Sequence, residues 1–149
     1  GKAIALAECA TSAYQKYAKD VIVNAKALAA ALEAEGMRAV SGGTETHLAL
    51  MDIRSTGITG KVADERCGAA GIVMNKNSIP YDPEKPGITS GIRVGTPAIT
   101  SRGVKEAEIP KIVELIDRAL MNREQVSEIS SLRKEVKELM GSRPLFTWE

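Results

Sequence analysis

The chain has 149 residues, a length that suits one domain large enough to bury a core of its own. Its 20 basic and 19 acidic side chains almost cancel, and this balance does not favour nucleic acid or a membrane surface as a partner. Cys9 and Cys67 lack the spacing of a zinc site or a disulfide framework, and no apolar run approaches the roughly 20 residues of a membrane span, so we expect a soluble, cytoplasmic protein with two buried thiols.

The first predicted element is a long helix over residues 3–35. This stretch contains no Pro or Gly, and its apolar residues between Val21 and Leu32 recur at helical spacing. We expect a bend near Thr11 and Ser12 and a left-handed cap at Gly36. Because the chain starts with glycine and runs directly into helix-like sequence, its start indicates a fragment of a longer protein.

Two short strands are predicted next, at residues 38–43 and 47–54, meeting at the turn GGTET as an antiparallel hairpin. Thr59 then caps a short helix that runs from Gly60 to about Ala70 and is ended by Gly71. The apolar triplet at residues 72–74 predicts a third strand.

Residues 75–91 contain Pro80, Pro83 and Pro86, a density that predicts an irregular loop of the kind that is often functional. A last strand is predicted at residues 92–96. Two amphipathic helices follow, at 104–122 and 125–140, the first starting near residue 107 so that its proline lies in the first turn.

These elements predict an α/β protein of the α+β type, in which a small mixed or antiparallel sheet of about three or four strands is covered by helices. A long N-terminal helix leads into it. The tail RPLFTWE contains the only Phe and the only Trp of the chain, and we expect this apolar strip to dock on a neighbouring surface.

No nucleophile with its base, carboxylate pair or metal cluster is evident in the sequence. His47 is the only histidine, and without an identifiable partner a structural role is the better interpretation. The pair Gly42 and Gly43 is more typical of a turn than of a phosphate-binding loop.

Arg93 is the strongest candidate for ligand binding. Its guanidinium can hold a carboxylate through two parallel hydrogen bonds, and Gly91 and Gly95 on either side let the main chain pack closely while leaving the guanidinium uncovered. The alternative is an ordinary surface charge, and the residues alone leave the two evenly balanced. Asn75 and Asn77 could read a heterocycle through their amides, or could equally form turns with their own backbone.

The wider motif resembles a known family. The run NKNSIPYDPEKPGITSGIRVGTPAITSRG, preceded by VSGGTETHLALMDIR and ITGKVADE, is similar to the C-terminal part of serine hydroxymethyltransferases. The opening GKAIALAE and YAKDVIVNAKALA resemble the helix that links the two domains of those enzymes. The resemblance covers nearly the whole chain and weakens after about Glu124.

The resemblance implies an aspartate aminotransferase-like fold. Residues 1–35 would then link to a large cofactor domain outside this chain, and residues 36–149 would form the C-terminal small domain. The whole enzyme would use pyridoxal phosphate, bound mainly by the large domain, to convert serine and tetrahydrofolate reversibly to glycine and 5,10-methylenetetrahydrofolate. It would act as a homodimer or homotetramer, with no nucleic acid and no membrane as partner.

The same resemblance implies the roles of single residues. Arg93 corresponds to the arginine that binds the α-carboxylate of the amino acid, and Asn77 to the asparagine that contacts the pterin part of folate, with Ser78 and Pro80 on the same side. No catalytic residue is expected in this chain, because the lysine that forms the Schiff base belongs to the preceding part of the family sequence. Lys76 neighbours the folate position and is not expected to replace it. The isolated chain is therefore expected to be inactive.

One departure from the family and two alternatives remain at this point. Glu45 and Thr46 stand where the family commonly has Asp and Asn, a mild change in a turn. The chain could instead be a freestanding module that binds folate or a protein. It could also be a dimerisation element in which Arg93 only forms an internal salt bridge.

Overall fold

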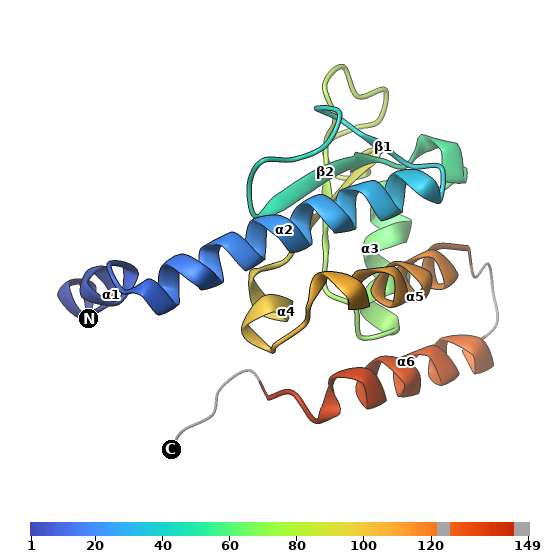
Figure 1. The fold of residues 1–149 in the computed structure, drawn as a ribbon. Helices are drawn as coiled ribbons and strands as arrows, with labels where there is room; N and C mark the ends of the chain where they lie inside the picture. The colour runs from blue at the N-terminus through green and yellow to red at the C-terminus, as the bar shows by residue number, and fades with distance from the viewer. Residues whose placement is uncertain (122–125, 145–149) are drawn as a thin grey trace.

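The computed structural model describes residues 1–121 and 126–144 (Figure 1). This part of the chain has helices packed against a four-stranded antiparallel sheet, which confirms the predicted fold class. The helices are α1 (Lys2–Cys9), α2 (Ser12–Ala34), α3 (Gly60–Ala69), α4 (Pro97–Ser101), α5 (Ile109–Met121) and α6 (Val126–Gly141). The strands are β1 (Arg38–Ala39), β2 (Leu48–Asp52), β3 (Asn75–Asn77) and β4 (Gly91–Gly95).

The predicted N-terminal helix is divided into α1 and α2. The Thr11 hydroxyl donates to the carbonyl of Glu8 at 2.7 Å and accepts from the amide of Tyr14 at 3.2 Å, so it ends one helix and begins the next. The expected bend is confirmed as a break between two helices. Gly36 has a φ of +87°, the left-handed conformation predicted for it.

The helix α1 projects from the body and contributes nothing to the core (Figure 1). Cys9 lies on it and is exposed, so the expectation of two buried thiols is wrong for this residue. Cys67 in α3 is buried as expected, and burial raises the pKa of its thiol to about 12.

The strands lie in the order β1-β2-β4-β3, and every neighbouring pair is antiparallel. The hairpin partners β1 and β2 are confirmed, although β1 is only two residues long. Its second residue is tied to α2, because the carboxylate of Glu33 accepts from the amide of Ala39 at 3.2 Å. β4 lies within one residue of the predicted last strand.

The third strand is displaced from its predicted place. The expected strand at residues 72–74 is wrong, because β3 begins three residues later and Val73 is 95% exposed. Gly71, with a φ of +83°, closes α3, and the amide of Ile72 donates to the carbonyl of Cys67 at 2.8 Å. The apolar triplet therefore belongs to the helix end and the connection, and its side chains at 72 and 74 pack against the core from there.

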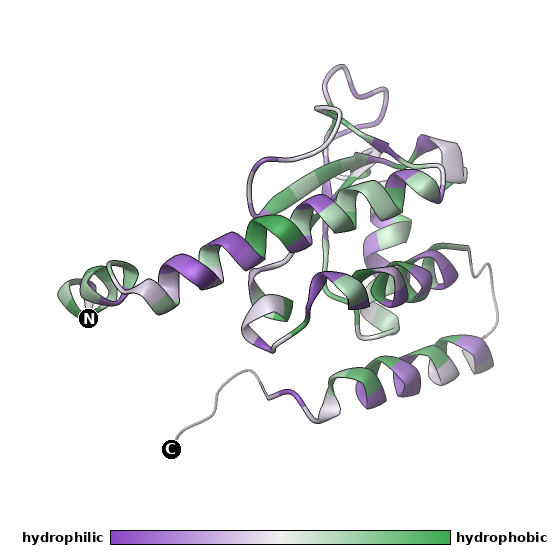
Figure 2. Ribbon diagram, viewed as in Figure 1, coloured by the Kyte–Doolittle hydropathy of each residue, from purple (hydrophilic) through white to green (hydrophobic). Residues whose placement is uncertain are grey.

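The helices form layers over one face of the sheet. α2 and α3 contact the strands, α5 packs against both of these helices, and α6 packs against α5 (Figure 1). Figure 2 shows α5 and α6 with apolar and hydrophilic positions on different sides of each helix, as in amphipathic helices that cover a core. The strand residues that face this layer are apolar and buried: Ala49, Met51, Ile92 and Val94.

The two predicted C-terminal helices are present as α5 and α6, and one further short helix precedes them. Pro110 lies in the first turn of α5 as predicted, but the short helix α4, which begins at Pro97, was not predicted. The expected docking of the tail falls on residues 145–149, which lie outside the described residues. Within the described part of the chain, no helix is long and apolar enough to cross a membrane. The division of the chain at residue 35 remains a prediction.

Candidate functional site

Arg93 lies on the face of the sheet opposite to the helices. Its neighbours Ile92 and Val94 are buried in the core, and because successive strand residues alternate between faces, the exposed Arg93 projects to the other side. The register places Leu50 of β2 and Asn75 of β3 directly opposite it. We call the strand residues Leu50, Asn75, Asn77 and Arg93 the open face.

The guanidinium of Arg93 has no hydrogen-bond or ion-pair partner among the residues that the structure describes. The internal salt bridge considered as an alternative is therefore absent from this part of the chain. A planar cation presented on a sheet without a partner can accept a carboxylate from outside.

The glycines before and after Arg93 are required by close contacts. A Cβ atom on Gly91 would lie 2.8 Å from the carbonyl oxygen of Asn77 and 3.0 Å from that of Met51, on the two neighbouring strands. A Cβ atom on Gly95 would lie 3.2 Å from the carbonyl oxygen of His47. Gly91 therefore lets β4 lie close to β2 and β3, and Gly95 lets the end of β4 lie close to the start of β2.

Asn77 shares the open face with Arg93. It pairs with Gly91, two residues from Arg93 along β4, and diagonal neighbours of this kind lie roughly 7–8 Å apart. Its amide nitrogen donates to the carbonyl of Ser78 at 2.8 Å, a local contact of the kind that the alternative interpretation expected. The side-chain oxygen remains available on the same face. Ser78 and Pro80 follow and are exposed.

Lys76 points the other way. It pairs with Ile92, whose side chain is in the core layer, and its amine lies 3.8 Å from the carboxylate of Asp64 in α3. The three residues of β3 thus divide by alternation, with the two asparagines on the open face and the lysine on the helical side.

His47 is the residue whose position the sequence did not reveal. It lies just before β2, is exposed, and lines a hollow of about 330 Å³ together with Asn75 and Arg93. The signal that would have found it is non-local: Leu48 pairs with Gly95, and this brings the start of β2 beside the end of β4. No local pattern in the sequence indicates that those two strands pair.

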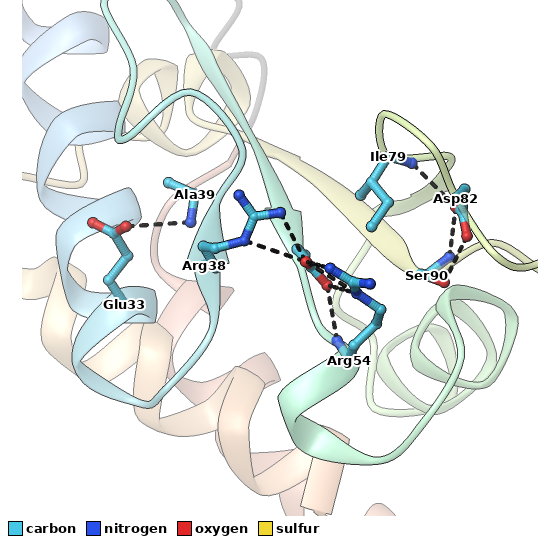
Figure 3. Close-up of polar contacts among 8 residues, drawn as sticks. Glu33, Arg38, Ala39, Arg54, Ile79, Asp82 and Ser90 are labelled. Atoms are coloured by element: carbon cyan, nitrogen blue, oxygen red, sulfur yellow. Dashed lines mark hydrogen bonds and ion pairs between the residues drawn. The ribbon is translucent and has the colours of Figure 1, made fainter.

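The loop after β3 is organised around Asp82 (Figure 3). Its carboxylate accepts from the amides of Ile79 at 3.1 Å, Glu84 at 2.9 Å and Ser90 at 2.9 Å, and from the hydroxyl of Ser90 at 2.6 Å. Burial raises the pKa of Asp82, but these hydrogen bonds to the charged form outweigh it and lower the pKa to about 2. The predicted irregular loop is confirmed from residue 78 onward.

The same loop is fastened to the first turn of α3. The amides of Gly60 and Lys61 donate to the carbonyls of Thr89 and Ile88 at 2.8 and 2.9 Å, which satisfies two amides that a helix start leaves free. Thr89 is buried with a φ of +61°, an unusual conformation for a β-branched residue. The loop and α3 therefore hold one another in place beside Asn77.

A second acidic group organises the neighbouring end of the sheet (Figure 3). Asp52 is buried and accepts from the guanidinium groups of Arg54 at 2.8 Å and Arg38 at 2.9 Å. Hydrogen bonds from Arg54, and to a smaller extent from Arg38, hold the pKa of Asp52 well below its usual range. These ion pairs hold β1, β2 and the turn after β2 together. Asp52 pairs with Gly91 of β4, and Gly91 pairs in turn with Asn77, so the cluster lies near Asn77.

Comparison with known proteins decides the family. A sequence model described as serine hydroxymethyltransferase matches residues 1–116, which is more than half of the chain. The chain belongs to the serine hydroxymethyltransferase family. The resemblance seen in the sequence is thereby confirmed, and the match to the family model ends close to the point where that resemblance weakens.

Curated relatives extend the match over nearly the whole chain. A serine hydroxymethyltransferase of Myxococcus xanthus is 48% identical over 146 residues, covering 98% of this chain and 35% of the relative. One of Acidobacterium capsulatum is 47% identical over 147 residues, covering 99% of this chain and 34% of the relative. The chain thus spans about a third of the length of these serine hydroxymethyltransferases.

Proposed function

We propose that this chain is the C-terminal part of a serine hydroxymethyltransferase, an enzyme that interconverts serine plus tetrahydrofolate and glycine plus 5,10-methylenetetrahydrofolate. In this proposal Arg93 binds the α-carboxylate of the amino acid. The observation that carries it is the guanidinium on the open face, which has no partner among the described residues, in a chain that belongs to this family.

The physical reason for an arginine here is orientation. A carboxylate held by two parallel N–H···O bonds cannot rotate, and a fixed substrate places the bond to be broken at a constant angle to the reacting group. The strand that carries Arg93 is bonded to neighbours on both sides, so the backbone from which the guanidinium projects is fixed. A lysine would supply the charge without the fixed angle.

Asn77 is proposed to contact the pterin part of tetrahydrofolate, with Ser78 and Pro80 on the same side. A side-chain amide offers both a donor and an acceptor, which suits the edge of a heterocycle. The strand register is consistent with separate contacts to the amino acid and to folate, since Asn77 and Arg93 share one face at diagonal positions. Two ligands that exchange a one-carbon unit must lie close to one another, and the open face offers neighbouring contacts for both.

The residues described here do not by themselves fit pyridoxal phosphate. No strand residue of the open face is a lysine, and Lys76 lies on the opposite side of β3 beside Asp64. We therefore propose that pyridoxal phosphate is bound mainly by a large domain outside this chain. We also propose that the whole enzyme is a homodimer or a homotetramer. The isolated chain is expected to be inactive, and turnover of serine by this chain with added cofactor and tetrahydrofolate would contradict the proposal.

The direct test is Arg93→Lys in the full-length enzyme. Losing a bidentate, charge-assisted contact typically costs about 1.5–3 kcal/mol, so the KM for serine should rise roughly 10- to 100-fold. Arg118→Lys is a matched control, because Arg118 pairs with Glu135 on the far helices α5 and α6. An unchanged KM for serine in Arg93→Lys would remove the proposed role.

A further inference from the structure

A second hollow lies on the helical side of the molecule, between α4, α5 and α6. It has a volume of about 550 Å³, within the range of cavities that hold small organic ligands. Its walls are mainly aliphatic, including Ile72, Ile99, Ile112, Val136 and Leu139. Large exposed apolar surfaces on proteins usually mark places where a ligand or another segment binds.

The chain leaves α6 at the rim of this hollow. Met140 and Gly141 in the last turn of α6 line it, and Arg102 from the α4 side donates to the carbonyls of Met140 at 2.7 Å and Arg143 at 2.6 Å. The guanidinium of Arg143 forms an ion pair with Glu108. Residues up to 143 are therefore fastened beside the hollow, and the segment that follows starts there.

We propose that residues 145–149 of this chain dock in the hollow, with Phe146 and Trp148 inserted between α4 and α6. Five residues span at most roughly 17 Å when extended, which is enough to turn back from Pro144 along the hollow. Burying the only Phe and the only Trp of the chain would remove a large apolar surface from water, because each aromatic side chain buries about 150–250 Å².

Two polar features fit the same occupant, one in the lining of the hollow and one on Arg143, whose carbonyl is bound by the lining residue Arg102. Arg133 and Lys137 of α6 line it and are exposed, so they place positive charge where the carboxylate of Glu149 would lie. The Nη1 atom of Arg143 is buried and has no hydrogen-bond partner among the described residues. A main-chain carbonyl of the docked segment would supply the acceptor that this atom lacks. This inference does not depend on the proposed function.

Trp148 makes the proposal directly measurable in the 149-residue chain, because it is the only tryptophan. Docking predicts blue-shifted indole emission and slow quenching by acrylamide. Ala98→Phe should fill the hollow, since Ala98 is exposed on α4 and lines it; emission should then shift to the red and quenching should rise several-fold. Ala30→Phe, at an exposed alanine of α2 away from the hollow, should change neither.

A charge reversal gives a second test that leaves the apolar walls intact. Lys137→Glu should also increase quenching, whereas Lys134→Glu, on the same helix but outside the hollow, should not. Native Trp148 that is quenched as fast as in the unfolded chain would overturn the proposal. So would protection that depends on protein concentration, which would assign the hollow to a second copy, or protection that Ala98→Phe and Lys137→Glu leave unchanged.

Discussion

Single carboxylates at two points fix the backbone around the open face. Asp52 joins Arg38 and Arg54 at one end of the sheet, and Asp82 gathers the amides and hydroxyl of the loop that leads from β3 to β4. Each carboxylate satisfies several donors at once, so each determines a local geometry that no apolar contact could specify. Their function is to hold the strands that carry Asn77 and Arg93.

Asp82→Asn is expected to destabilise the chain in a pH-dependent way. The folded pKa of about 2 lies below the ordinary value of about 3.9, so the ionised carboxylate stabilises the fold above pH 4 and this contribution is lost as the pH falls towards 2. The difference in Tm between the native chain and Asp82→Asn should be constant at higher pH and should shrink between about pH 4 and 2.

Glu84→Gln is the matched control, since Glu84 lies in the same loop and its side chain has no described partner. It should show no such pH-dependent gap. A stability difference for Asp82→Asn that stays constant from pH 5 to pH 2 would show that the charge of the carboxylate does not organise the loop.

At the scale of elements, the sequence predicted best what depends on neighbouring residues. Gly36 and Gly71 end helices, Thr59 caps α3, and Pro110 begins α5, because each acts within one turn of backbone. The strand β3 was misplaced because an apolar triplet is a local signal, whereas membership of the sheet depends on pairing with β4, far along the chain. Local hydrophobicity cannot specify that register.

Two glycines of α3 provide an element-scale prediction with an internal control. A Cβ atom on Gly60 would clash with Thr89 and lie 2.5 Å from the carbonyl oxygen of Gly91, so Gly60→Ala should lower the free energy of unfolding by about 1–3 kcal/mol despite its better helix propensity. Gly68 has open space around it, and Gly68→Ala should raise the free energy of unfolding by up to about 1 kcal/mol.

Urea unfolding of both variants measures this contrast. The two changes in the free energy of unfolding should have opposite signs because the atoms around the two glycines differ, while the substitution and the helix are the same. Equal effects of the two substitutions would show that α3 does not pack against the loop at Thr89 as described.

At the scale of the whole molecule, the open face is a product of topology. Arg93 and Asn77 are predicted as site residues from their motif, but they share a face because β3 pairs with β4. His47 lies near Arg93 only because β2 pairs with the other edge of β4. Neither pairing can be read from periodicity. The sequence therefore predicts roles for single residues, and the fold shows how those residues are arranged.

We propose that the open face serves two different ligands, and one comparison tests this most directly. KM values for serine and for tetrahydrofolate should be measured for Arg93→Lys and Asn77→Ala in the full-length enzyme. Arg93→Lys should raise the KM for serine and leave that for tetrahydrofolate nearly unchanged. Asn77→Ala should do the reverse, by roughly 2- to 10-fold for the loss of a neutral hydrogen bond. If both substitutions weaken the same ligand, or neither changes either value, the division of the open face between amino acid and folate is wrong.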